Sequence, residues 1–261
     1  MSRQFRFLYS PLLASKYYEI NQHVMLSFAK ESGNCNVNFL IKNLETLKKG
    51  DIFALKPSNT SNSSNTSTGT LGVDSINQIA RISDVLKKNQ IECTLDKELL
   101  KDSKLFWNVY NQLKHNGVNP YLTFQMYLSD ELQYLQKFIK TSSDPKVKLV
   151  RGAYLNYENK LYLNKTKLQT DYNYRQAIRL LEDKKIPTIY ATYNKQDLKF
   201  LNSFPDSKRF GFLHLIPPFY KIDNHHKVYN YVLCGTLRDS LPFIRRQLPS
   251  FLKHRIKSLY N

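Results

Sequence analysis

Residues 121–150, YLTFQMYLSDELQYLQKFIKTSSDPKVKLV, decide the fold class. The apolar run Tyr121–Leu128 is predicted to be a strand, and Ser129-Asp130 is a suitable cap for the helical periodicity that follows it. Pro145 then precedes a second strand, KVKLV. The order strand, helix, strand is that of the βαβ unit, in which a helix joins two parallel strands.

The same alternation of short apolar runs and helical periodicities continues on both sides of this unit. It indicates either an open doubly wound sheet or a closed barrel. A chain of 261 residues fits a barrel, and no GxGxxG or GxxxxGKS/T motif supports an open nucleotide-binding sheet. We therefore predict a (βα)8 TIM-like barrel. Its other strands are expected at 24–27, 52–55, 91–95, 188–193, 210–215 and 228–233, and its other helices at 37–47, 76–86, 98–113, 171–182, around 198–201 and at 241–248.

The barrel domain is assigned to residues 24–261. Within it, the low-complexity polar stretch 57–71 is predicted to be a surface loop inserted in the domain. Residues 1–23 form an N-terminal segment whose first acidic residue is Glu19. An acid-free start with arginine and serine is typical of a mitochondrial transit segment and equally of a basic first helix, so both interpretations remain open.

Composition excludes several classes of protein. Hydrophobic residues make up 41% of the chain and aromatic residues 13%, which excludes wholesale disorder. No apolar run is long enough to span a bilayer. Three dispersed cysteines, Cys35, Cys93 and Cys234, exclude a disulfide scaffold and a cysteine-rich zinc site. The net charge of +18 favours anionic partners, but no nucleic-acid-binding signature accompanies it, and we expect no nucleic acid partner.

The reactive groups of a parallel barrel lie where each strand ends and its loop begins. At these places the sequence offers cations and amides rather than the paired acids of glycoside hydrolases. No HxH or HExxH pattern offers metal ligands, and no metal site is expected. Such a pocket suits a carboxylate substrate and a phosphate-bearing cofactor, with Arg245 and Arg246 either clamping a carboxylate or facing water. The polar residues at the predicted strand ends are Lys56, Thr94, Gln125, Lys148, Arg151, Thr192, Asn194, His214 and Tyr231.

The stretch Lys148–Tyr154, KLVRGAY, with Glu158 four residues on, closely resembles the signature of the proline dehydrogenase family. Weaker similarities to that family stand in the same order along residues 24–250. They are Phe53–Lys56 (FALK), Phe124–Leu128 (FQMYL), Thr170–Tyr174 (TDYNY), Ala191–Asn194 (ATYN), Phe210-Gly211, Val228–Gly235 and Leu241–Arg246 (LPFIRR).

The resemblance implies a distorted (βα)8 barrel that binds FAD at its strand ends and oxidises L-proline to Δ1-pyrroline-5-carboxylate, the first step of proline catabolism. It implies that Lys56, Arg245 and Arg246 pair with the proline carboxylate. Tyr231 would pack on the substrate ring. The residues that it implies for cofactor binding are Gln125, Lys148, Val150, Arg151, Gly152, Tyr154, Thr192 and Asn194.

The resemblance also bears on partners and location. Eukaryotic members of the family pass electrons to ubiquinone at the mitochondrial inner membrane. Ubiquinone is therefore the implied acceptor, and the matrix side of that membrane the implied location. The basic composition suits peripheral association with anionic lipids.

Several family positions carry other residues here. By spacing, the acidic residue of the family's DAE segment falls on Thr94, and Asp96 replaces it only if the register shifts by two. Two interpretations follow. The retained Lys148, Gln125 and Tyr231 favour a divergent working flavoenzyme, and the alternative is a catalytically degenerate member that acts as a partner or regulator of an active paralogue. The other altered positions are Tyr193 for histidine, Phe212 for glutamine, Leu215 for glycine and Pro249 for an acid.

Overall fold

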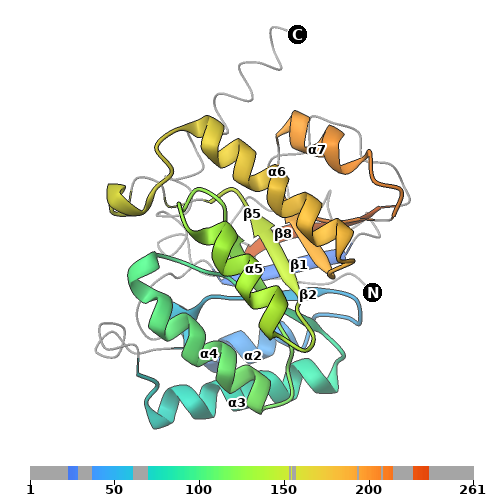
Figure 1. The fold of residues 1–261 in the computed structure, drawn as a ribbon. Helices are drawn as coiled ribbons and strands as arrows, with labels where there is room; N and C mark the ends of the chain where they lie inside the picture. The colour runs from blue at the N-terminus through green and yellow to red at the C-terminus, as the bar shows by residue number, and fades with distance from the viewer. Residues whose placement is uncertain are drawn as a thin grey trace, which may run out of the picture.

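The computed structural model describes residues 23–28, 37–60, 70–152, 154, 157–192, 194–206, 208–213 and 226–234. Its centre is a closed barrel whose strands follow one another in chain order (Figure 1). Each strand runs parallel to its neighbours, and the last strand closes the barrel on the first. This confirms the predicted (βα)8 barrel. The strands are β1 (His23–Phe28), β2 (Ile52–Leu55), β3 (Glu92–Leu95), β4 (Tyr121–Gln125), β5 (Val147–Val150), β6 (Thr188–Ala191), β7 (Arg209–Leu213) and β8 (Lys227–Cys234).

Helices cover the outside of the barrel, with α2, α3 and α4 on one side, α6 and α7 on another, and α5 between them, next to α6 (Figure 1). The α-helices are α2 (Val37–Leu44), α3 (Val73–Lys88), α4 (Ser103–His115), α5 (Glu131–Thr141), α6 (Lys167–Asp183) and α7 (Lys195–Leu201), and the short 3-10 helices are η1 (Pro57–Asn59), η2 (Leu100–Asp102) and η3 (Lys160–Tyr162). In the described part of the chain, no helix is both long enough and apolar enough to cross a membrane.

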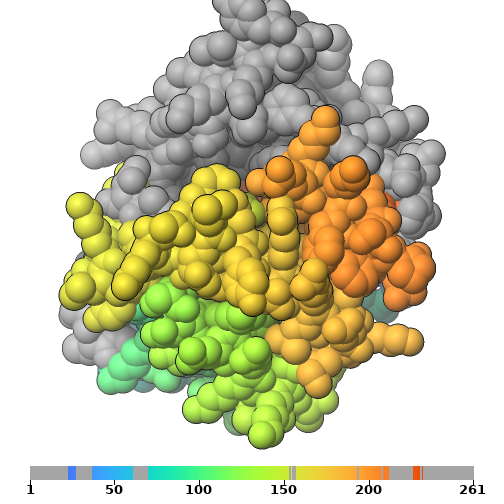
Figure 2. All heavy atoms as spheres, turned by 45° about the horizontal axis from the view of Figure 1, so that its top comes forward, coloured from blue at the N-terminus to red at the C-terminus, as the bar shows by residue number. Residues whose placement is uncertain are grey.

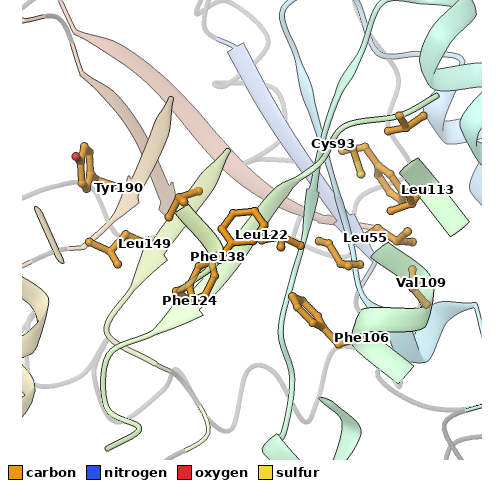
Figure 3. Close-up of a cluster of buried hydrophobic side chains, with 14 of the residues drawn as sticks. Leu55, Cys93, Phe106, Val109, Leu113, Leu122, Phe124, Phe138, Leu149 and Tyr190 are labelled. Atoms are coloured by element: carbon orange, nitrogen blue, oxygen red, sulfur yellow. The ribbon is translucent and has the colours of Figure 1, made fainter. Parts of the chain in front are cut away.

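Strand β4 shows how the barrel separates its two faces. Leu122 and Phe124 belong to the large apolar core between strands and helices, whereas Tyr121 belongs to a second core inside the barrel. Successive side chains of a strand point to opposite faces, so Thr123 and Gln125 also point inward. Outside, the rings of Phe124 and Phe138 of α5 lie 5.5 Å apart (Figure 3). The same alternation on each strand directs a column of side chains along the barrel axis.

The structure corrects two details of the sequence interpretation. The strand predicted at Tyr121–Leu128 ends at Gln125, because the chain turns there and Leu128 pairs with Leu163 in an antiparallel bridge. The start of the stretch 57–71 is not a surface loop. Its residues 57–60 are buried in and beside η1.

Ser58 explains that burial. Its backbone N–H and its hydroxyl donate to the carboxylate of Glu98 at 3.0 and 2.8 Å, so a residue forty positions away satisfies them. Three predicted segments lie outside the described residues. They are residues 61–69 of the low-complexity stretch, residues 1–22 of the N-terminal segment and the helix predicted at 241–248.

Candidate active site

The C-terminal ends of the strands bring four ionisable side chains into one cluster. Lys148 on β5 donates from Nζ to Asp96 Oδ1 at 2.6 Å, and its ammonium lies 5.1 Å from the centre of the Tyr231 ring on β8. The Tyr231 hydroxyl donates to Asp96 Oδ2 at 3.2 Å. Lys56, which directly follows β2, is buried, and its charge lowers the pKa of Asp96. The structure therefore brings together three predicted residues, Lys56, Lys148 and Tyr231.

The carboxylate of this cluster comes from Asp96, the residue that the sequence left open as the alternative to Thr94. Thr94 points the same way and donates from Oγ1 to Asp96 Oδ1 at 3.0 Å, and Thr123 donates to the same oxygen at 3.2 Å. Burial acts to raise the pKa of Asp96, but Lys148 and Thr94 outweigh it, and the pKa lies below its ordinary value. Asp96 is therefore ionised at neutral pH.

The ammonium of Lys148 retains donor capacity. Its residue is only 5% exposed, yet among the described residues Nζ donates to Asp96 alone. An ammonium group carries three donors. A buried cation with two donor positions that no described residue fills is costly to maintain in a core, so the cluster is a candidate binding site for an electron-rich ligand.

Gln125, the last residue of β4, is held from two sides. Its Nε2 donates to the carbonyls of Lys97 and Glu98 at 2.9 and 2.8 Å, and its backbone N–H donates to Glu131 Oε1 at 3.0 Å. Glu131 is itself paired with Lys97 at 2.7 Å. In the described part of the chain the side-chain oxygen Oε1 has no donor, so this fixed amide presents an acceptor at the mouth.

Arg151, the residue after β5, is clamped by two carboxylates. One terminal nitrogen contacts Asp171 of α6, and the other pairs with Asp197 of α7. The guanidinium also lies 5.3 Å from the centre of the buried Tyr174 ring. Asp197 is fully buried. The guanidinium is therefore fixed before any ligand arrives, and its charge is already neutralised by protein groups.

Two further predicted residues support this clamp. Thr192, after β6, donates from Oγ1 to Asp197 Oδ2 at 3.2 Å. Asn194 caps α7, because its side-chain oxygen accepts from the backbone N–H groups of Gln196 and Asp197. In the described structure these two side chains hold other protein groups in place.

The segment after Arg151 is shaped by close packing. Gly152 has φ +121°, and a Cβ there would lie 1.4 Å from an atom of the Tyr127 ring, so only glycine fits. The Val150 carbonyl accepts from the backbone N–H of Met126 at 3.0 Å. Tyr154 adds to the effect of burial and of nearby Asp96 in raising the pKa of Tyr231. These contacts place predicted residues around the same mouth.

Glu158 of the signature stretch joins this segment to the neighbouring loop. Its Oε1 accepts from the backbone N–H of Leu100 at 2.7 Å and from the Tyr127 hydroxyl at 3.4 Å. Its carboxylate therefore ties the segment after β5 to η2, on the far side of β4.

Other predicted positions fall where the structure gives no description. Arg245, Arg246, Tyr193, Leu215 and Pro249 lie outside the described residues, as does His214. Phe212 is described only as part of β7. The described residues contain no cluster of three or more histidine, cysteine, aspartate or glutamate side chains that could hold a metal ion.

Sequence reasoning did not assign several residues of the cluster. Thr123 and the two partners of Arg151, Asp171 and Asp197, were not singled out as site residues. Thr123 could have been found, because it shares the inward face of β4 with Gln125. The two aspartates lie on helices, so no strand-end rule points to them. Asp171 stands in the stretch Thr170–Tyr174 that resembles the family, and that stretch was the available signal for it.

Comparisons with known proteins bear on the family and on the fold. The profile of the family described as "Proline dehydrogenase" matches residues 14–249. No curated protein sequence matches significantly. Among solved structures, proline utilization A (PutA) from Bdellovibrio bacteriovorus, inactivated by N-propargylglycine, has a TM-score of 0.70 and 16% identity, over 91% of this chain and 31% of that one. A bifunctional proline utilization A (PutA) protein gives 0.71 and 18%, over 87% and 28%. The likeness concerns the fold, and this chain spans less than a third of either protein.

Proposed function

The chain belongs to the proline dehydrogenase family, a family of flavin oxidoreductases, and from this premise we propose that it oxidises L-proline to Δ1-pyrroline-5-carboxylate with FAD. The observation that carries the proposal is the buried Lys148–Asp96 pair, with Tyr231 beside it, at the C-terminal mouth of the barrel. Barrels of this kind carry their chemistry at that mouth.

The residues present fit a flavin. The open oxygen of Gln125 can accept from an imide N–H, and the open donors of Lys148 can reach an electron-rich ring edge. FAD supplies the two-electron acceptor when bound. Gln125, Lys148, Val150, Arg151, Gly152 and Tyr154 would hold it, with Thr192 and Asn194 supporting Arg151 through α7.

The substrate would be held by positive charge and by packing. Lys56 would pair with the proline carboxylate, together with Arg245 and Arg246, and the Tyr231 ring would pack on the pyrrolidine ring. Asp96 keeps both Lys148 and the Tyr231 hydroxyl in fixed positions. Such fixed groups hold the amino acid rigidly over the acceptor, which is the main contribution a protein makes to this reaction.

The proposal extends to the electron acceptor and the location. Ubiquinone would take the electrons, at the matrix face of the mitochondrial inner membrane, where the protein would associate peripherally. The net charge of +18 supports contact with anionic lipids. An acid-poor first segment supports import.

The visible spectrum of the purified protein tests the proposal. We expect a yellow protein whose flavin absorbance bleaches anaerobically when L-proline is added and stays unchanged with glycine. A protein that takes up no flavin after incubation with FAD would contradict it. Flavin that proline never bleaches, in a protein that co-purifies with an active paralogue, would instead support the degenerate-partner interpretation.

A further inference from the structure

The segment 157–172, which runs from the loop after β5 into the first turns of α6, carries several exposed apolar and aromatic side chains. Leu161 is 83% exposed and Leu168 78% exposed. Tyr157, Tyr162 and Tyr172 are exposed as well. Single exposed apolar residues are ordinary on a soluble protein, but five within one short segment form a candidate interaction surface. We call it the 157–172 surface.

Hydrogen bonds hold this surface in one arrangement. The backbone N–H of Ser129 donates to the Tyr162 carbonyl at 2.9 Å, and the N–H of Asn164 donates to the Tyr127 carbonyl at 2.9 Å. The Asn164 side chain donates to the Thr170 hydroxyl at 3.1 Å, which joins the loop to α6. Figure 2 shows the segment, in yellow, as a strip of the molecular surface beside the green α5.

On α6 the surface continues as one face of the helix. Leu168 and Tyr172 are four residues apart, so they lie one above the other. Arg175 and Arg179 follow at the same helical spacing. Apolar side chains at the N-terminal end of α6 thus give way to cations along a single face.

The charge of the surface is positive. Lys160, Lys165 and Lys167 are exposed. The two acids within the segment are engaged with the protein, because Glu158 accepts from the Leu100 backbone N–H and Asp171 contacts Arg151. Lys167 also bridges to Asp171 at 2.9 Å. The exposed acid Asp130 borders the surface, next to Ser129.

We propose that the 157–172 surface binds the interface of an anionic lipid bilayer. Exposed leucines with tyrosines and lysines are the composition of peripheral membrane anchors, in which apolar groups enter the headgroup region and lysines meet anionic lipids. A second copy of the chain fits poorly, because its lysines would face these lysines. Nucleic acid would use the tyrosines for stacking but gives the two leucines nothing to bury in.

The 157–172 surface lies near the C-terminal mouth, and if the proposed function holds, membrane binding there would serve electron transfer. The segment begins a few residues after Lys148 and Arg151, so a docked bilayer would lie beside the C-terminal mouth. A lipid-soluble electron acceptor would then reach that mouth from the membrane. The contact itself stands on exposure and charge alone.

Vesicle sedimentation of the full-length protein tests the apolar part. We expect binding to phosphatidylcholine vesicles that contain phosphatidylglycerol, and at least ten-fold weaker binding to phosphatidylcholine alone. The double variant Leu161→Glu/Leu168→Glu should lose about a hundred-fold in affinity for the anionic vesicles. The matched control is Val73→Glu on α3, which alters a residue that is 74% exposed elsewhere and should change nothing.

A second set of variants tests the charge. Lys160→Glu/Lys165→Glu should weaken binding to anionic vesicles about ten-fold or more, whereas Lys88→Glu/Lys184→Glu, at exposed positions outside the surface, should have little effect. Asp130→Asn should strengthen binding. Circular dichroism and thermal unfolding confirm that each variant folds.

Three outcomes would overturn the inference. The first is unchanged vesicle binding by folded Leu161→Glu/Leu168→Glu protein, and the second is an equal loss in both lysine pairs, which would show a general charge effect. The third is loss of dimers or of oligonucleotide binding in the leucine variant while vesicle binding persists. If the protein binds vesicles but takes up no flavin, this inference is supported and the proposed oxidation is contradicted. If proline reduces its flavin but the protein does not bind vesicles, the proposed oxidation is supported and this inference is contradicted.

Discussion

At the N-terminal mouth of the barrel, Arg209 of β7 and Glu92 of β3 form a two-point ion pair, whereas at the C-terminal mouth Lys148 meets Asp96 through one nitrogen. Tyrosine hydroxyls take part at both ends. The terminal nitrogens of Arg209 contact the hydroxyls of Tyr121 and Tyr229, and Tyr121 also donates to Glu92 at 3.0 Å. The two mouths therefore use the same chemical groups in different geometries.

The two mouths differ in how many hydrogen-bond donors of the cation are paired with protein acceptors. Both terminal nitrogens of Arg209 are occupied by protein acceptors, and only its buried Nε lacks a partner among the described residues. Protein side chains therefore fill this mouth. The ammonium of buried Lys148 has only Asp96 among the described residues and keeps open donors. A forked cation matched to a carboxylate closes a barrel, and a point cation with spare donors leaves a place for a ligand.

The largest effect should follow removal of the open cation. Lys148→Met is expected to lower the rate of flavin reduction by proline about a thousand-fold, or ~4 kcal/mol in the barrier, because methionine removes both the positive charge and the open donors. Anaerobic stopped-flow measurement of flavin bleaching records it. Lys146→Met is the matched control, since that lysine lies two positions earlier, just before β5, and its ammonium lies over the Tyr121 ring at the other mouth. Equal losses in both variants would contradict the distinction between the mouths.

The N-terminal mouth should respond in stability rather than in rate. Arg209→Met leaves Glu92 and two tyrosine hydroxyls without their shared partner, and we expect the free energy of unfolding to fall by about 2–3 kcal/mol. Chemical denaturation measures this. The double variant Arg209→Met/Glu92→Gln should lose less than the sum of the single losses. Unchanged stability in Arg209→Met would contradict a stabilising role for this ion pair. A loss of rate as large as that of Lys148→Met would contradict a purely structural role for this mouth.

A smaller effect should come from the clamp on Arg151. Asp197→Asn keeps the shape of the side chain but removes one of two carboxylates, so the guanidinium becomes less fixed and more positive. We expect FAD affinity to change about three- to ten-fold, or ~1 kcal/mol, with a change in the flavin reduction potential. Fluorescence titration and spectroelectrochemistry measure both. Asp183→Asn, at an exposed position near the end of α6, should leave both unchanged, and a null result in Asp197→Asn would remove Arg151 from the cofactor contacts.

The barrel and part of its C-terminal mouth could be predicted from the sequence because both depend on local periodicity. Each short apolar run is a strand, and residues that end parallel strands converge, which is why Lys56, Gln125, Lys148 and Tyr231 were found together. The register of β3 could not be predicted in this way. Thr94 and Asp96 are two residues apart, lie on the same face and both end up in the cluster, so the pattern alone does not say which supplies the charge.

Tertiary contacts decided the other differences. Asp197 and Asp171 meet Arg151 only because α6 and α7 pack over the barrel with those faces inward, and helix rotation about its axis is not encoded at strand ends. The polar residues 57–60 have the composition of a solvent loop. They are buried because Glu98 offers its carboxylate to Ser58. A buried polar group depends on a partner, and that partner was forty residues away.

The smallest expected difference between the mouths is in acid stability. Burial acts to raise the pKa values of Asp96 and Glu92, but Lys148 and Arg209 respectively outweigh it, and both pKa values lie below their ordinary range. Each carboxylate therefore stabilises the fold above the ordinary carboxyl pKa of about 4, and this contribution is lost as the pH falls below that value. Asp96→Asn should flatten the fall of unfolding free energy with acid more than Glu92→Gln, because the Asp96 side chain is 15% exposed and that of Glu92 34%; the difference should be below about 1 kcal/mol. Denaturation at several pH values measures it, with exposed Asp84→Asn as the control. If Glu92→Gln instead flattened the fall of unfolding free energy more than Asp96→Asn, the N-terminal ion pair would be the more strongly desolvated of the two.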